Sequence, residues 1–136
     1  MNKKILYELK NLDCEIISRM NKQSMPLGLT QVKIIEYLIK NEHTYQKDLE
    51  KNLKLSRATI SCVLKTMEKN KIINRVTDKI DNRTKKVVLN PKCVELFEKR
   101  KKELKKLEET ATRNISKKEI DEFLNTLEKM IKNLSN

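Results

Sequence analysis

The sequence has few of the residues on which catalytic and metal sites depend. Its 136 residues include one Gly, one His, no Trp and three Cys, and Cys14, Cys62 and Cys93 form no C-x-x-C pair. Neither a disulfide framework nor a zinc site is therefore indicated. No P-loop, catalytic triad or paired-carboxylate arrangement is present, so we expect no enzyme activity and no cofactor.

Aromatic residues and long apolar runs are also scarce. Three Tyr and two Phe are scattered along the chain, which is too few to stack on the bases of single-stranded nucleic acid. The N-terminal MNKKILYELK returns to charge too soon for a signal peptide, and no stretch approaches the ~20 apolar residues of a membrane span. We expect a cytoplasmic protein without a membrane partner.

Positive charge is abundant and unevenly distributed. The net charge is +12, and residues 44–90 contain twelve Lys and Arg against five Asp and Glu, so a third of the chain carries more than half of that charge. A lysine-rich surface that is merely well solvated is one interpretation. The concentration of charge in one segment favours the other, which is binding to a polyanion.

The charged segment begins with two helices separated by a short turn. The first helix is expected to start at a Thr44 cap and to bury Leu49, and a three-residue turn ending at Leu55 follows it. Ser56 then caps the second helix, because its hydroxyl can accept hydrogen bonds from the free N–H groups of the first turn. The second helix has a buried stripe at i, i+3, i+4, i+7 spacing, made of Ile60, Val63, Leu64 and Met67.

The opposite face of the second helix carries small and hydrogen-bonding side chains, with cations toward its C-terminal end. Small side chains let a backbone approach base edges, hydroxyl groups form hydrogen bonds there, and lysines reach phosphates. This face predicts a recognition helix for the major groove of double-stranded DNA. Its candidate DNA-binding residues are Ser56, Arg57, Ala58, Thr59, Ser61, Cys62 and Lys65.

After Lys69 the apolar period changes from 3.6 to 2, which indicates a β-hairpin. Residues 73–77 alternate, residues 79–84 are polar, and KVVL resumes as a strand. A charged hairpin tip can reach the minor groove or the DNA backbone. The cations on or beside this tip are Lys79, Arg83, Lys85 and Lys86.

These motifs resemble those of the MarR family of bacterial winged helix-turn-helix transcription regulators. SRATIS, MEKNKIINR and DNRTKKVVLN are similar to the corresponding stretches of that family. The hairpin is the most specific part, because the family's wing carries an Asp-x-Arg pair followed by a strand ending in Leu-Thr-x-x-Gly. Asp81, Arg83, Val88 and Leu89 stand in those places. The resemblance implies that Arg83 enters the minor groove and that Asp81 orients it.

The chain departs from the family pattern at four positions. Cys62 stands where many relatives have a basic residue on the recognition helix, and Lys71 replaces a helix-ending Gly. Asn90 replaces the Thr after the second hairpin strand, and Cys93 replaces the Gly. The resemblance therefore implies no particular base preference.

The flanking segments are expected to be helices with extensive apolar surface. A long helix covers residues 3–20, and after a break at residues 24–29 a second helix begins at a Thr30 cap. Asn90 and Pro91 start a helix that runs to about residue 112, and a capping box at residues 116–119 starts the last one.

A winged helix-turn-helix of under 60 residues cannot cover these apolar faces, so we expect a second copy of the chain to do so. An intramolecular three-helix bundle is the alternative. A homodimer, which the family resemblance also implies, would present two recognition helices ~34–36 Å apart to a palindromic operator.

Two further sites have competing interpretations. Met20, Met25, Tyr37 and the helix at residues 92–112 could line a crevice for a small-molecule effector, as in many MarR-like regulators, although core packing explains these residues equally well. Cys14 lies where some MarR-like peroxide sensors have a reactive cysteine. The carboxylates of the residues on either side of it disfavour a thiolate and hence a redox role.

The sequence thus predicts a mainly α fold with a small β-hairpin wing over residues 1–136. Residues 30–90 form the winged helix-turn-helix DNA-binding lobe, and residues 1–24 and 91–136 supply dimerisation helices. The predicted function is sequence-specific regulation of transcription, as a repressor that a small effector releases. A winged-helix protein-interaction module and a nonspecific architectural DNA binder are the alternatives.

Overall fold

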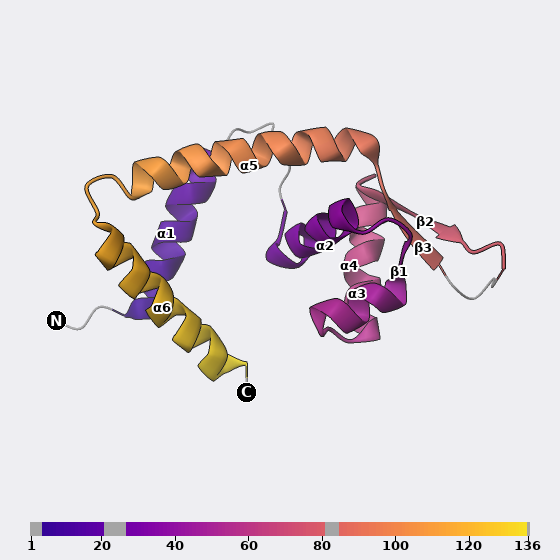
Figure 1. The fold of residues 1–136 in the computed structure, drawn as a ribbon, viewed down its shortest axis with the longest axis horizontal. Helices are drawn as coiled ribbons and strands as arrows, with labels where there is room; N and C mark the ends of the chain where they lie inside the picture. The colour runs from indigo at the N-terminus through magenta and orange to yellow at the C-terminus, as the bar shows by residue number, and fades with distance from the viewer. Residues whose placement is uncertain (1–3, 21–26, 81–84, 136) are drawn as a thin grey trace. The chain divides into compact units, whose positions relative to one another are not determined.

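A computed structural model describes residues 4–20, 27–80 and 85–135 of the chain. Within these ranges six helices and three short strands form (Figure 1), which confirms the predicted fold class. The elements are α1 (Ile5–Arg19), α2 (Leu29–Lys40), β1 (Thr44–Tyr45), α3 (Gln46–Leu53), α4 (Arg57–Lys69), β2 (Ile73–Thr77), β3 (Lys85–Leu89), α5 (Pro91–Ala111) and α6 (Lys117–Leu134). None of the helices described combines the length and apolar composition that a membrane crossing requires.

The chain divides into two units, residues 1–21 with 101–136 and residues 22–100, so α5 contributes to both. The second unit contains α2, α3, α4, the sheet and the first ten residues of α5, and is called the lobe below. Its core draws on every one of these helices. The buried core side chains are Ile34, Ile35, Leu38, Leu49, Ile60, Leu64, Met67, Ile72, Ile73, Val87, Cys93 and Phe97.

The sheet is antiparallel with the strand order β1-β3-β2. β2 and β3 form the predicted hairpin, in register from the pair Ile73–Leu89 to the pair Thr77–Lys85. Val87 and Leu89 on β3 face the core on the same side as Ile73, because paired residues of an antiparallel ladder share a face. The central strand therefore fixes the wing to the lobe.

Two predicted helix caps are wrong. Thr44 lies in β1, where it pairs with Val87, and its buried hydroxyl donates to the carbonyl of Asn41 at 2.8 Å. The N-cap of α3 is Tyr45 instead, and its own N–H donates to the Asp48 carboxylate at 2.8 Å. Thr30 lies inside the first turn of α2, whose N-cap is Gly28.

The C-terminal end of α4 is closed by Lys71 in a left-handed conformation, with φ of 60°. The N–H of Lys71 donates to the carbonyl of Glu68 at 3.0 Å, and the N–H of Ile72 donates to that of Met67 at 2.9 Å. This pair of bonds is the Schellman motif, which normally has glycine at the left-handed position. Lys71 thus occupies a backbone position at which Gly is favoured.

The other unit exposes most of its apolar residues. Among the described residues of α1 and α6, none is buried. The predicted capping box starts α6, since the N–H of Glu119 donates to Ser116 Oγ at 3.1 Å and the N–H of Ser116 donates to Glu119 Oε1 at 3.4 Å. The exposed large apolar side chains of these two helices are Ile5, Leu6, Tyr7, Leu12, Ile17, Phe123, Leu124, Ile131 and Leu134.

Candidate nucleic-acid interface

Helix α4 is oriented by its buried stripe and by its N-cap. Ile60, Leu64 and Met67 are fully buried in the lobe core. Ser56 accepts a hydrogen bond from the N–H of Thr59 at 3.1 Å, as predicted, and its hydroxyl also lies 2.9 Å from Thr59 Oγ1. Because one face is anchored along the whole helix, the opposite face must look outward.

The predicted recognition residues lie on this outward face. Six of the seven are exposed and Ser61 is half-buried. Small and hydroxyl-bearing side chains occupy the first two turns, while Lys65 and Lys69 follow toward the C-terminal end. The exposed residues are Ser56, Arg57, Ala58, Thr59, Cys62 and Lys65.

The turn that precedes α4 is a second left-handed position. Lys54 has φ of 54°, and the N–H of Leu55 donates back to the carbonyl of Glu50 at 3.2 Å. Leu53 and Leu55 on either side pack against the lobe core. The angle between α3 and α4 is therefore set by apolar contacts and by a closed turn.

The wing is tied to α4 by one ion pair. The Glu68 carboxylate accepts hydrogen bonds from the backbone N–H and from the guanidinium of Arg75 on β2. The hydrogen bond from the Arg75 guanidinium is the main reason that the pKa of the Glu68 carboxyl is lowered. This pair was not predicted, because it joins a helix to a strand residue that lies seven positions further along the chain.

The arm of the wing beyond β2 carries both charge and apolar surface. Lys79 and Lys85 are exposed, and Ile80 is 96% exposed. The N–H of Ile80 donates to Asp78 Oδ1 at 2.9 Å, a local turn that holds the Ile80 side chain in solvent. Ile80 was not among the predicted site residues. The sequence signal that could have identified it is that it is an apolar residue within the otherwise polar run of residues 79–84. Asp81 and Arg83 lie outside the described residues.

Of Met20, Met25 and Tyr37, which were predicted to line an effector crevice, only Tyr37 is a described residue of the lobe. Tyr37 is half-buried against the lobe core, and its hydroxyl accepts a hydrogen bond from Asn52 Nδ2 at 3.1 Å. Met20 belongs to the other unit, and Met25 lies outside the described residues.

The three cysteines differ in exposure. Cys14 and Cys62 are exposed, whereas Cys93 is buried and its burial raises the pKa of its thiol. No group of three or more His, Cys, Asp or Glu in the described ranges is placed to hold a metal ion.

A helix-turn-helix whose second helix is followed by a strand hairpin defines a winged helix-turn-helix, here with the short strand β1 added to the wing. Residues 27–85, which span most of this arrangement, match the model of the MarR family. The family resemblance of the sequence is thereby confirmed. No curated protein sequence matches the chain.

Solved structures of MarR-type proteins share the fold over nearly the whole chain. A MarR protein from Peptoclostridium difficile has 23% identity and a TM-score of 0.69, and the match covers 98% of this chain and 89% of that protein's chain. The heme sensor PefR from Streptococcus agalactiae, in complex with heme, has 24% identity and a TM-score of 0.76, with coverages of 97% and 95%. MepR from S. aureus, in a complex with DNA, has 23% identity and a TM-score of 0.71, with coverages of 98% and 99%.

Proposed function

We propose that the protein is a transcription regulator that binds double-stranded DNA with α4 in the major groove. The observation that carries the proposal is the two-sided character of α4. One side is fully buried through Ile60, Leu64 and Met67, and the other presents exposed hydroxyl, small and cationic side chains. The match of residues 27–85 to the model of the MarR family supports the same function.

The residues of the interface divide by the part of DNA that they contact. Small and hydroxyl-bearing residues of the first turns of α4 approach base edges, and Lys65 contacts phosphate. Lys79 and Lys85 on the wing neutralise the backbone beside the minor groove, where Arg83, oriented by Asp81, reads groove width. The Glu68–Arg75 pair holds the wing at a fixed place relative to α4.

The active species that we propose is a homodimer. Residues 30–90 act as the DNA-binding lobe, and residues 1–24 and 91–136 provide the dimer contacts. The exposed apolar side chains of α1 and α6 support this arrangement, because a second copy would remove them from water. The two-fold axis then matches a palindromic operator.

We further propose that the dimer represses transcription by occupying its operator and that a small molecule weakens this binding. The relatives PefR, in complex with heme, and MepR, bound to ethidium bromide, support the effector step by analogy. Effector and DNA would then lower each other's affinity by the same factor.

The test is binding of the purified full chain to fragmented genomic DNA, followed by sequencing of the bound fragments. A regulator should enrich a few palindromic sites and bind them at least about a thousandfold more tightly than random duplex at the same salt concentration. Lys65→Ala should weaken binding, whereas Lys33→Ala, an exposed cation of α2, should not.

Each alternative function gives a different result. A nonspecific architectural binder would hold all duplexes with equal affinity at fixed salt. A protein-docking module would retain no duplex above background. Either result would refute the proposed function.

A further inference from the structure

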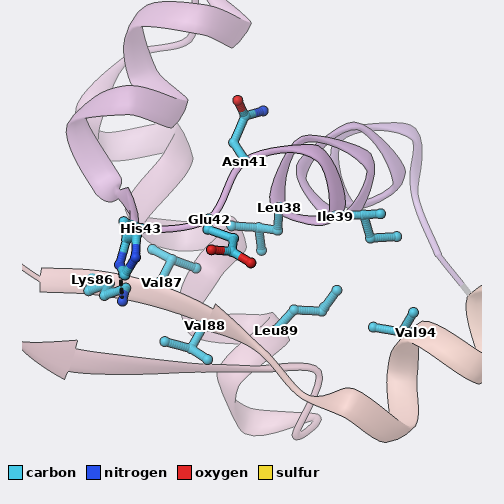
Figure 2. Close-up of a pocket in the computed structure, with 10 residues that line it drawn as sticks. All are labelled: Leu38, Ile39, Asn41, Glu42, His43, Lys86, Val87, Val88, Leu89 and Val94. Atoms are coloured by element: carbon cyan, nitrogen blue, oxygen red, sulfur yellow. Dashed lines mark hydrogen bonds between the residues drawn. The ribbon is translucent and has the colours of Figure 1, made fainter.

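A pocket of about 430 Å³ lies within the lobe, between the end of α2, strand β3 and the first turn of α5 (Figure 2). Its volume is in the range of small-molecule sites, about 300–1,000 Å³. Of the described residues predicted to line an effector crevice, only Val94, in the expected helix at residues 92–112, contributes to it. The lining residues are Leu38, Ile39, Asn41, Glu42, His43, Lys86, Val87, Val88, Leu89 and Val94.

The pocket is polar at one end and apolar at the other. Figure 2 shows His43 and Lys86 together at one end, Glu42 between the ends, and Ile39, Leu89 and Val94 toward the other. Ile39 and Val88 are 41% and 39% exposed, so part of the apolar surface faces water. A ligand with a short apolar body would cover that surface.

The polar end contains a ready site for an anion. Lys86 Nζ lies 2.7 Å from His43 Nδ1. An ammonium group has only donors, so the imidazole nitrogen accepts this bond and Nε2 carries the ring proton. Two ammonium N–H groups remain for a ligand, and a charged acceptor such as a carboxylate binds them more strongly than a neutral one.

Glu42 supplies the opposite charge. Among the described residues, no hydrogen bond or ion pair involves its carboxylate, which points into the pocket in Figure 2. The loop that carries Glu42 and His43 is fixed on both sides. Asn41 Nδ2 donates to the carbonyl of Tyr37 at 2.9 Å, and the hydroxyl of Thr44 donates to the carbonyl of Asn41 at 2.8 Å. The backbone that carries the Glu42 carboxylate is therefore held on both sides, and Lys86 lies on the paired strand β3.

We propose that this pocket binds a small apolar zwitterion, of which an α-amino acid with a hydrophobic side chain is the simplest form. Its carboxylate pairs with Lys86 and its ammonium group pairs with Glu42, while its side chain covers Ile39, Leu89 and Val94. A ligand with only a negative charge would leave the Glu42 carboxylate unpaired and would be repelled by it. A ligand with only a positive charge would likewise leave Lys86 unpaired and be repelled by it. The proposal concerns ligand binding alone and stands whether or not the lobe binds DNA.

Calorimetric titration of the full chain without DNA tests the site with four probes. L-leucine and L-phenylalanine carry both charges, 4-methylpentanoate lacks the ammonium group of leucine, and 3-methylbutylamine lacks its carboxylate. At least one amino acid should bind, and the two single-charge probes should bind about tenfold or more weakly than leucine. If neither amino acid binds, or if a single-charge probe binds as tightly as leucine, the proposal is refuted.

Two variants assign the charges. Glu42→Gln should remove the preference for leucine over 4-methylpentanoate, and Lys86→Met should remove the preference for leucine over 3-methylbutylamine. Glu36→Gln, at an exposed carboxylate of α2 outside the pocket, is the matched control and should leave all affinities unchanged. A leucine preference that survives both pocket variants would place the ligand elsewhere.

Discussion

Glu68 on α4 accepts two hydrogen bonds from Arg75 on β2, one from the backbone N–H and one from the guanidinium, each at 3.2 Å. One carboxylate thus fixes both the position and the side chain of the wing's first strand. The Arg75 side chain is only 15% exposed, so it is not available for a contact with DNA. The cation that the sequence shows at this position therefore acts within the lobe.

Glu68→Gln should lower the melting temperature at neutral pH and have little effect in strong acid. The pKa of Glu68 is lowered in the folded protein, chiefly by the hydrogen bond from Arg75. A lowered pKa gives stability that is present above the unfolded-state pKa and is lost as pH falls through the folded-state pKa. Melting curves of both proteins across the acidic range measure this effect. An equal difference in melting temperature at all pH values would show that the stabilisation does not depend on the Glu68 charge. Glu36→Gln is the control for the loss of one negative charge.

Lys71→Gly should stabilise the protein by about 1 kcal/mol, because glycine adopts the left-handed conformation at this position without steric strain. Chemical denaturation measures the free energy of unfolding of both proteins. Lys51→Gly is the matched control within α3, where the backbone is helical, and it should destabilise by about 1 kcal/mol. Destabilisation by both substitutions would show that the Lys71 side chain makes a contribution larger than its backbone strain.

Lys65→Ala and Arg83→Ala should impair DNA binding in different ways. Removing the phosphate contact of Lys65 should lower the affinity for all DNA sequences alike. It should also reduce the slope of log affinity against log salt by about 1. Loss of Arg83 should also weaken the preference for A·T-rich operator flanks, because a narrow minor groove concentrates negative potential. Fluorescence anisotropy on matched duplexes at several salt concentrations separates the two. Unchanged binding by Arg83→Ala would remove the wing from the proposed interface.

Ile80→Ser should lower DNA affinity without changing the salt slope. The side chain is almost fully exposed beside Lys79 and carries no charge, so its contact with the sugar or the groove would release no counterions. The same anisotropy series measures this effect, with Lys79→Ala as the comparison that should change the slope. Wild-type affinity for Ile80→Ser would mean that Ile80 does not touch DNA.

Leu124→Asp should convert the protein from dimer to monomer. Leu124 is 55% exposed on α6, so the substitution would cost a monomeric protein little stability. In a dimer the new charge would be buried without a partner. Light scattering after size-exclusion chromatography gives the mass. Asn125→Asp, which adds the same charge at the next exposed residue, should remain dimeric, and a monomeric wild type would contradict the dimer.

Local signals in the sequence were sufficient to predict α4. The Ser56 cap and the stripe of Ile60, Leu64 and Met67 need only neighbouring residues, and both are as predicted. Strand β1 was missed because a two-residue strand has no pattern of its own and forms by pairing with Val87 and Lys86 on β3. Thr44 was consequently taken for a helix cap.

The pocket was missed for the same physical reason. His43 and Lys86 are far apart along the chain and meet only because β1 places the loop after α2 against β3. Within the sequence, His43 is an isolated histidine and Lys86 is one of many lysines. Neither residue has a neighbour that marks it, so only the tertiary fold reveals the pair.

The thiol of Cys93 packs against the end of α4, where its Sγ lies 3.7 Å from the carbonyl oxygen of Lys71. Asn90 Nδ2 donates to the same oxygen at 3.0 Å. A thiol-specific reagent can reach Cys93 only when this junction opens, and the raised pKa slows the reaction further. With Cys14 and Cys62 replaced by serine, the labelling rate of Cys93 measures how often the start of α5 separates transiently from the end of α4.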